Sequence, residues 1–202
     1  MIVQPWVGAL LALLAGYLLG SIPFGVLLTR ATGGGDLRTI GSGNIGATNV
    51  LRTGNKAAAA LTLLLDGAKG AVAVLIAARF SADYAALAAL GAFFGHCYPV
   101  WLRFRGGKGV STLLGISLAL SWPCGLVFAA VWLGAVLVTR ISSVGGMAAA
   151  VSTPVCAAVL GKFGLVLLFL VFTLLVLWKH RGNLERLLAG TEPRIGAKPP
   201  VG

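Results

Sequence analysis

The chain alternates between long apolar runs and shorter polar, glycine-rich stretches. The apolar runs occupy residues 2–28, 57–78, 84–102, 110–138, 147–160 and 163–178. A helix needs about 20 apolar residues to cross a bilayer, whereas a membrane strand shows about ten residues of alternating hydrophobicity. The lengths of these runs therefore predict an all-α integral membrane protein. Gly16, Gly20, Pro23 and Gly25, near the end of the first run, predict a kink or a close helix contact there.

The run at 110–138 is longer than one crossing needs. It is either one kinked helix or two short helices that turn at Pro123. With a turn, all Lys and Arg residues except Lys69, Arg79 and Lys162 lie on one side of the membrane. The positive-inside rule favours that arrangement. We therefore predict about seven transmembrane helices, some of them short, with the N-terminus outside and the C-terminus in the cytoplasm.

Composition agrees with a membrane protein. The 202 residues are 58% hydrophobic and 10% charged, whereas soluble domains are roughly 25% charged. We predict a single transmembrane domain over residues 1–202, with residues 190–202 as a flexible Pro/Gly-rich tail.

The net charge of +11 indicates orientation in the membrane, contact with anionic lipid, or anionic substrates. A nucleic-acid partner is a poor interpretation, because the charges flank helices and little of the chain lies outside apolar runs. Cys97, Cys124 and Cys156 lie in apolar surroundings, and their spacing suggests neither a zinc site nor a disulfide framework.

Two polar stretches are candidates for anion binding. The basic loop, residues 103–112, holds three cations and three glycines within seven residues; glycine lets the backbone approach a ligand and lysine pairs with phosphate. A second stretch, Gly41–Arg52, is rich in glycine, asparagine and hydroxyl side chains, but it lacks the ending of a P-loop. The alternative for the first is a loop that only orients the protein, and for the second a polar interhelical loop.

Other polar residues give weaker signals. Asp66 and Lys69 share one face of a membrane helix, which indicates either a function or a mutual ion pair. A lone histidine such as His96 is more often a hydrogen-bonded structural residue than a catalyst. Ser142-Ser143 is a weak signal by itself, whereas His180 and Asn183, three residues apart, are able to face the same way.

Taken together, these stretches closely resemble the bacterial acyl-phosphate-dependent glycerol-3-phosphate acyltransferases of the PlsY type. The resemblance runs in the right order along nearly the whole chain. The matching residues are Gly20–Gly25, Gly41–Val50 with Arg52, Asp66 with Lys69-Gly70, Gly95-His96, Tyr98–Val100, Phe104, Gly106–Val110, His180-Arg181, Asn183 and Arg186–Leu188. The chain departs from the family around residues 142–146, where Ser143 is the best match to a phosphate-contacting serine and Ser142 is its neighbour.

The resemblance implies transfer of a fatty acyl group from acyl phosphate to the 1-hydroxyl of sn-glycerol 3-phosphate, giving lysophosphatidate and phosphate. It implies a multi-pass protein of the bacterial inner (plasma) membrane with a cytoplasmic active site, no metal and no cofactor. Its partners would be both substrates, membrane lipid and an upstream enzyme that forms acyl phosphate. The implied catalytic residues are His180, Asn183, Lys108 and Ser42, and the implied substrate-binding residues are Arg52, Gly43, Asn44, Gly46, Thr48, Asn49, Gly106, Gly107, Gly109, Ser143 and Ser142.

Two other functions compete with this interpretation. An anion transporter would also use a cationic cytoplasmic site, but its pathway should show polar residues in the outer half, which is nearly free of them. A phosphotransferase usually needs acidic residues to hold a metal ion, and only Asp36, Asp66 and Glu185 stand out on the cytoplasmic side. His180 and Glu185 also have the spacing of the His-x4-acid motif of unrelated acyltransferases, which we treat as coincidence.

Overall fold

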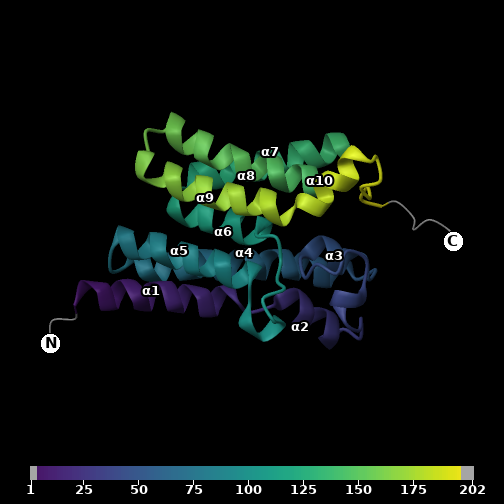
Figure 1. Cartoon of the computed structure of the whole chain (residues 1–202), viewed down its shortest axis with the longest axis horizontal. Coiled ribbons are helices and arrows are strands. Elements are labelled where there is room, and N and C mark those ends of the chain that lie inside the picture. Colours follow the sequence, from purple (N-terminus) through teal and green to yellow (C-terminus); the bar gives the residue numbers. More distant parts are fainter. Residues whose placement is uncertain (1–3, 197–202) are drawn as a thin grey trace. The chain divides into compact units, whose positions relative to one another are not determined.

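The computed structural model describes residues 4–196, and every regular element in that range is helical. This confirms the predicted all-α membrane fold. The elements are α1 (Pro5–Gly20), α2 (Phe24–Ala31), η1 (Leu37–Thr39), α3 (Ala47–Leu51), α4 (Lys56–Ala78), α5 (Ala82–Cys97), η2 (Val100–Leu102), α6 (Val110–Leu120), α7 (Trp122–Thr139), α8 (Ser142–Val159), α9 (Phe163–Lys179) and α10 (Arg181–Leu188) (Figure 1).

Five segments are long and apolar enough to cross a membrane: Trp6–Ala31, Lys56–Ala78, Ala82–Leu102, Trp122–Thr139 and Ser142–Val159. The pair α9 and α10, bent by 57°, would supply a sixth, and α6 is a shorter apolar helix. The number of crossings and the orientation of the termini remain predictions.

Helices are interrupted at the two places that the sequence indicated. The first apolar run divides between α1 and α2 at Ser21–Pro23, and the long run at 110–138 divides at Ser121, whose backbone is extended. The run is therefore divided into two helices, and the break lies two residues before Pro123.

The break between α1 and α2 frees carbonyl groups inside an apolar region, and remote side chains bond them. The indole Nε1 of Trp101 donates to the carbonyl of Ser21 at 2.9 Å, and the ammonium of Lys69 donates to the carbonyl of Ile22 at 2.8 Å. A backbone carbonyl left without a donor in hydrocarbon costs several kcal/mol (roughly). These two long-range contacts therefore make the break tolerable.

The chain forms two compact units, the first ending at Gly125 and the second beginning at Leu126, and we describe each by itself. In the first unit α1 packs along α5, and α4 packs on both α5 and α6. Small residues permit close approach: a Cβ on Gly16 would collide with the backbone of Ala88, and one on Gly20 with that of Ala92. The glycines of the first run thus make the predicted close helix contacts.

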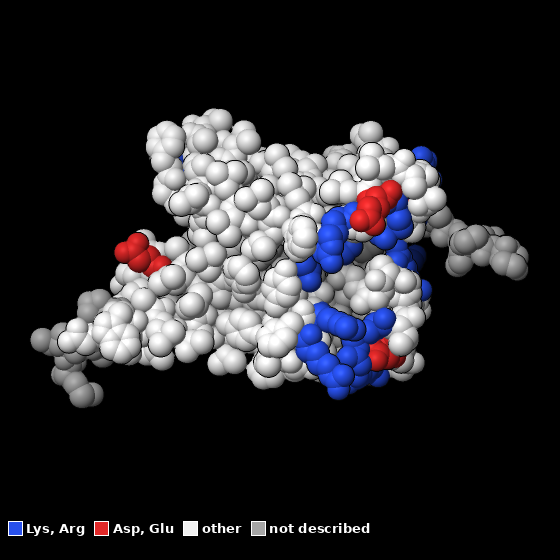
Figure 2. Space-filling model, in the orientation of Figure 1, with Lys and Arg blue, Asp and Glu red and all other residues white. Residues whose placement is uncertain are grey.

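One end of the first unit carries an apolar cluster beneath its polar loops. Val26, Leu37, Ile45, Val50, Ala58, Ala59 and Leu102 form this buried cluster. It joins the glycine-rich loop to the start of the basic loop, although these segments are about 50 residues apart in sequence. Lys and Arg side chains gather at the same end of the unit, near α2 and α3 (Figure 2).

In the second unit α8 packs along α9. The hydroxyl of Thr173 on α9 donates to the carbonyl of Ala150 on α8 at 2.8 Å. The stretch 190–202, predicted as a flexible tail, is described only as far as residue 196. Within that part the amide of Ile195 donates to the carbonyl of Arg140 at 2.7 Å, so the beginning of the stretch is bonded to the unit. Residues 197–202 lie outside the described residues.

We expect Gly115→Ala to destabilise the protein, because a Cβ there would overlap the backbone of Gly67 where α6 crosses α4. Overpacking of this kind costs about 1–3 kcal/mol. Thermal denaturation in detergent should show a lower melting temperature for this variant. Gly134→Ala in α7 is the matched control, since nothing lies within 4 Å of its added Cβ, and it should melt no lower than the parent protein. Equal melting of both variants would contradict the described α4–α6 packing.

Candidate functional site

The glycine-rich loop, Gly41–Arg52, is organised around the buried side chain of Asn49. Its amide nitrogen donates to the carbonyls of Leu37 and Ile40 at 3.1 and 2.9 Å. Its amide oxygen accepts from the Ser42 N–H at 3.3 Å and from Arg52 Nη1 at 3.4 Å. These contacts use the whole bonding capacity of the amide. Asn49 therefore shapes the loop, and its predicted role in binding substrate stays a prediction.

The rest of this loop is more accessible. Ser42 and Arg52 are exposed, and Gly43, Asn44, Gly46 and Thr48 are half-buried. Gly43 has a φ of +66°, a conformation that strongly favours glycine. The loop thus holds a serine hydroxyl and a guanidinium where an anion can reach them.

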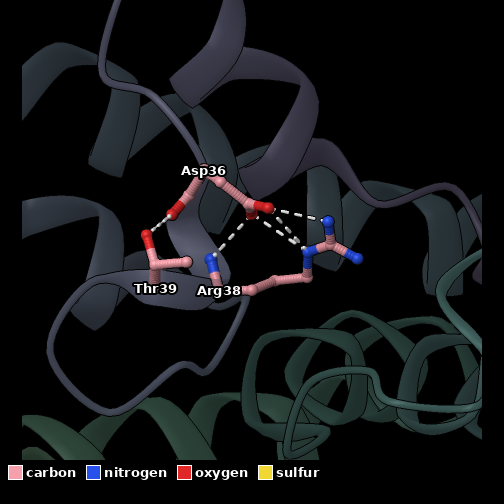
Figure 3. Close-up of polar contacts among 3 residues, drawn as sticks. All are labelled: Asp36, Arg38 and Thr39. Carbon is pink, nitrogen blue, oxygen red and sulfur yellow. Dashed lines mark hydrogen bonds and ion pairs between the residues drawn. The ribbon is translucent and has the colours of Figure 1, made fainter.

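The segment that leads into the loop is fixed by an exposed ion pair. Arg38 Nη2 lies 2.7 Å from Asp36 Oδ2, and the Arg38 amide donates to Asp36 Oδ1 at 3.0 Å (Figure 3). The Thr39 hydroxyl donates to the Asp36 carbonyl at 2.9 Å. Hydrogen bonding from the Arg38 side chain holds the pKa of Asp36 well below its usual range. The carboxylate therefore stays charged and neutralises one cation beside the loop.

The basic loop is seated on the C-terminal turn of α5. The amides of Gly106 and Gly107 donate to the carbonyls of Cys97 and His96 at 3.2 and 3.0 Å. A Cβ on Gly107 would collide with the His96 imidazole, and one on Gly109 with the ring of Phe93. The sequence suggested that these glycines let a ligand approach the backbone. In the structure, their lack of a Cβ lets the loop pack closely against α5. Their predicted contacts with substrate are not tested by this packing.

The cations of this loop differ in environment. Arg103 and Arg105 are exposed, whereas Lys108 is half-buried between the buried residues Gly107 and Gly109. Lys108 immediately precedes the turn that opens α6. Of the three cations, it is the one most closely held by the fold.

Asp66 and Lys69 form a buried ion pair in α4, with Lys69 Nζ 2.7 Å from Asp66 Oδ1. This confirms the ion-pair alternative of the sequence interpretation. His96 Nδ1 lies 3.8 Å from the same carboxylate oxygen, and the His96 side chain is also buried. Of the three groups, His96 contacts the basic loop, at Gly107.

In the second unit, Ser143 and Asn183 converge on one carboxylate that sequence reasoning missed. The Ser143 hydroxyl donates to Glu192 Oε1 at 2.7 Å, and the Asn183 amide donates to the same oxygen. Arg186 Nε lies 2.7 Å from Glu192 Oε2. Ser143, rather than Ser142, belongs to this cluster. One available signal was that Glu192 is among only five acidic residues in a chain with 16 Lys and Arg.

Burial alone would raise the pKa of Glu192, but the hydrogen bonds from Asn183, Ser143 and Arg186 outweigh it and lower the pKa below its ordinary value. Glu192 is therefore charged at neutral pH. The cluster is built to hold an anionic oxygen.

His180 caps α9 and is buried beside this cluster's helix, α10. Its Nδ1 lies 2.8 Å from the carbonyl of Val176. A carbonyl only accepts, so Nδ1 carries the proton, and in the neutral ring Nε2 carries the lone pair. This tautomer leaves the Nε2 lone pair as the basic atom of the ring.

The predicted site residues fall into two groups. The first unit holds Ser42, Gly43, Asn44, Gly46, Thr48, Asn49, Arg52, Gly106, Gly107, Lys108 and Gly109, and the second holds Ser142, Ser143, His180 and Asn183. Within the part of the chain that the structure describes, no group of three or more His, Cys, Asp or Glu side chains is arranged to hold a metal ion.

Comparison with known proteins identifies relatives along nearly the whole chain. The family model described as glycerol-3-phosphate acyltransferase matches residues 10–190. A glycerol-3-phosphate acyltransferase of Mesorhizobium japonicum is 58% identical over 191 residues, which cover 95% of this chain and 98% of the relative. One of Ruegeria pomeroyi is 59% identical over 184 residues, covering 91% of each chain.

Two solved structures are similar in fold. One is PlsY (YgiH), an integral membrane glycerol 3-phosphate acyltransferase, in its glycerol 3-phosphate form. It has a TM-score of 0.89 and 38% identity, over 93% of this chain and 96% of that one. The lysophosphatidic acid form has a TM-score of 0.86 and 37% identity, over 93% and 95% of the two chains.

We expect Glu192→Gln to lower the free energy of unfolding at pH 7 by about 1–3 kcal/mol, because hydrogen bonds to a charged group are among the stronger ones. The pKa of Glu192 is depressed in the folded protein, so this stability is present above its ordinary value of 4.5 and is lost as the pH falls through the lower folded value. Melting curves of the two proteins should therefore converge as the pH falls through the folded pKa of Glu192. Glu185→Gln, an exposed change on α10, should leave stability unchanged across the same pH range.

Proposed function

The chain belongs to the glycerol-3-phosphate acyltransferase family, and we propose that acyl phosphate is its acyl donor. The 1-hydroxyl oxygen of sn-glycerol 3-phosphate attacks the acyl carbonyl carbon. The bond from that carbon to the phosphate oxygen breaks, and the hydroxyl proton leaves with phosphate or a base. The products are 1-acylglycerol 3-phosphate (lysophosphatidate) and inorganic phosphate. The observation that carries the proposal is the family match over residues 10–190, which includes every predicted site residue.

Both substrates carry phosphate, and the chain offers cations for them. Lys108 is half-buried and Arg52 lies beside a loop of backbone amides. We assign Lys108, Arg52, Ser143, Asn183 and His180 to glycerol 3-phosphate. Lysine binds phosphate as a point charge, whereas arginine is able to bind two oxygens at once.

We assign Ser42 and the loop from Gly43 to Asn49 to acyl phosphate. Donors in this loop would stabilise the negative charge that develops on the acyl carbonyl oxygen. Acyl phosphate is already activated, so the reaction needs no protein nucleophile, and positioning and electrostatics supply most of the rate enhancement. The proton of the 1-hydroxyl passes to a substrate phosphate oxygen or to Nε2 of His180, which the Val176 carbonyl leaves in the basic tautomer.

We infer that the protein works in the bacterial plasma membrane with its site on the cytoplasmic face. The gathering of Lys and Arg around the polar loops of the first unit supports this orientation (Figure 2). The acyl donor is amphiphilic and would partition into the bilayer, while glycerol 3-phosphate is soluble. Acyl phosphate would come from an upstream enzyme that activates fatty acyl groups with phosphate.

We expect purified protein in detergent to release phosphate from palmitoyl phosphate only when glycerol 3-phosphate is present. Acyl-CoA should not replace acyl phosphate as the donor. Product formation, followed by mass spectrometry of 1-palmitoylglycerol 3-phosphate, should match the phosphate released, and EDTA should leave the rate unchanged. Folded protein that turns over acyl-CoA but not acyl phosphate would overturn the proposed donor.

We expect Lys108→Ala to raise the KM for glycerol 3-phosphate by about 10- to 100-fold, because it removes a charge-assisted contact worth about 1.5–3 kcal/mol. Arg105→Ala removes an exposed cation from the same loop and should change this KM by less than about threefold, the range of a weak exposed charge contact. Initial rates at saturating acyl phosphate measure both. Equal KM values for the two variants would remove Lys108 from the substrate contacts.

A further inference from the structure

The imidazole of His96 supports the glycines that carry the basic loop. The Gly107 amide donates to the His96 carbonyl at 3.0 Å. Gly107 also lies so close to the imidazole ring that an added Cβ would collide with Nε2 and Cε1 of His96. His96 thus holds Gly107 from both its backbone and its side chain, one residue before Lys108.

The His96 ring lies next to a buried charge network. Its Nδ1 lies 3.8 Å from Asp66 Oδ1, which lies 2.7 Å from Lys69 Nζ. Lys69 also donates to the carbonyl of Ile22 at 2.8 Å and lies over the ring of Phe24. The network therefore links the α1–α2 break, α4 and the end of α5 to the loop that carries Lys108.

Stability alone is a poor reason for such a network. Desolvating two charges costs several kcal/mol (roughly) for each ion, and well-packed apolar residues often replace a buried pair with no loss of stability. Apolar residues cannot reproduce the hydrogen bond from Lys69 to the Ile22 carbonyl or the carboxylate charge 3.8 Å from His96 Nδ1. The chemistry of the network is suited to fixing a position.

His96 itself does not meet substrate in this arrangement. Gly107 lies against Nε2 and Cε1 of the His96 ring, so the loop covers the ring atoms that would face a substrate hydroxyl. A role as the proton acceptor in acyl transfer would require contact with the 1-hydroxyl of glycerol 3-phosphate. His96 therefore acts on the reaction through the loop that it supports.

We propose that His96, next to the Asp66–Lys69 pair, is a positioning residue. It fixes the position of the Gly107 backbone and so places the Lys108 ammonium for the phosphate of glycerol 3-phosphate. This inference rests on the proposed role of Lys108. A displacement of about 1 Å in a binding group can cost up to about 100-fold in rate or affinity. A support that prevents such a shift is thus kinetically important without touching substrate.

The experiment measures KM for glycerol 3-phosphate and kcat for His96→Ala. We expect KM to rise about tenfold while kcat stays within about twofold, because binding is impaired and the reacting groups are not. His96→Gln, whose amide is able to occupy the place of Nε2, should restore much of the lost affinity. Tyr17→Phe is the matched control: it removes one hydrogen bond, from the Tyr17 hydroxyl to the Tyr98 carbonyl at 2.8 Å, on the same turn of α5. It should leave KM unchanged.

A double-mutant cycle separates this inference from the proposed function. If His96 acts through Lys108, His96→Ala should raise KM no further in a Lys108→Ala background. Normal KM for Lys108→Ala alone would overturn the proposed site. Raised KM for Lys108→Ala with normal KM for His96→Ala would overturn only the positioning role. Additive effects of the two substitutions would also overturn it.

If His96→Ala does not fold, a second variant tests the same inference. Replacing both charges, Asp66→Leu with Lys69→Met, leaves no unpaired charge, and the Ile22 carbonyl keeps the Phe24 N–H as a donor at 3.1 Å, so the protein should fold. The ring of His96 then loses its electrostatic partner, and KM for glycerol 3-phosphate should rise while kcat is retained. A normal KM in this folded variant would overturn the role of the network. Isothermal titration with glycerol 3-phosphate alone gives the same comparison without any acyl donor.

Discussion

The first unit depends on the close approach of helix backbones at small residues. Lipid tails are as apolar as leucine, so helices in a bilayer gain little from burying large side chains and associate through tight packing instead. The contacts of Gly16 with Ala88 and of Gly115 with Gly67 are of this kind. Because the helices cannot slide at these points without steric collision, the loops at their ends start from fixed positions. The polar chemistry of the unit is built on that rigidity.

Much of the fold could be predicted because its signals are periodic or compositional. The apolar runs predicted the helices, and counting cations predicted the break that the structure shows at Ser121. The family resemblance that the polar loops suggested is confirmed by the match over residues 10–190. The apolar runs are local signals, and the cation count and the family match sum over many residues. Neither kind of signal depends on the details of tertiary packing.

The arrangement of the candidate site was less predictable, since it depends on contacts between distant residues. Asn49 was predicted to bind substrate, but residue type alone could not show that four internal partners would share its amide. Gly107 was explained by ligand approach, whereas its neighbour in the structure is the His96 ring. Glu192 was missed because its partner Ser143 lies 49 residues away, and no local pattern links them.

The interruption of the first apolar run has a consequence for how the sequence can vary. Pro23 ends one helix and begins another, and the carbonyls exposed by the break are bonded by Trp101 and Lys69. Neither donor is near the break in sequence. Loss of Trp101 removes a donor from the Ser21 carbonyl, and loss of Lys69 leaves the Ile22 carbonyl with the Phe24 N–H at 3.1 Å. The three positions therefore constrain one another, because a change at any of them alters the hydrogen bonds of the same break.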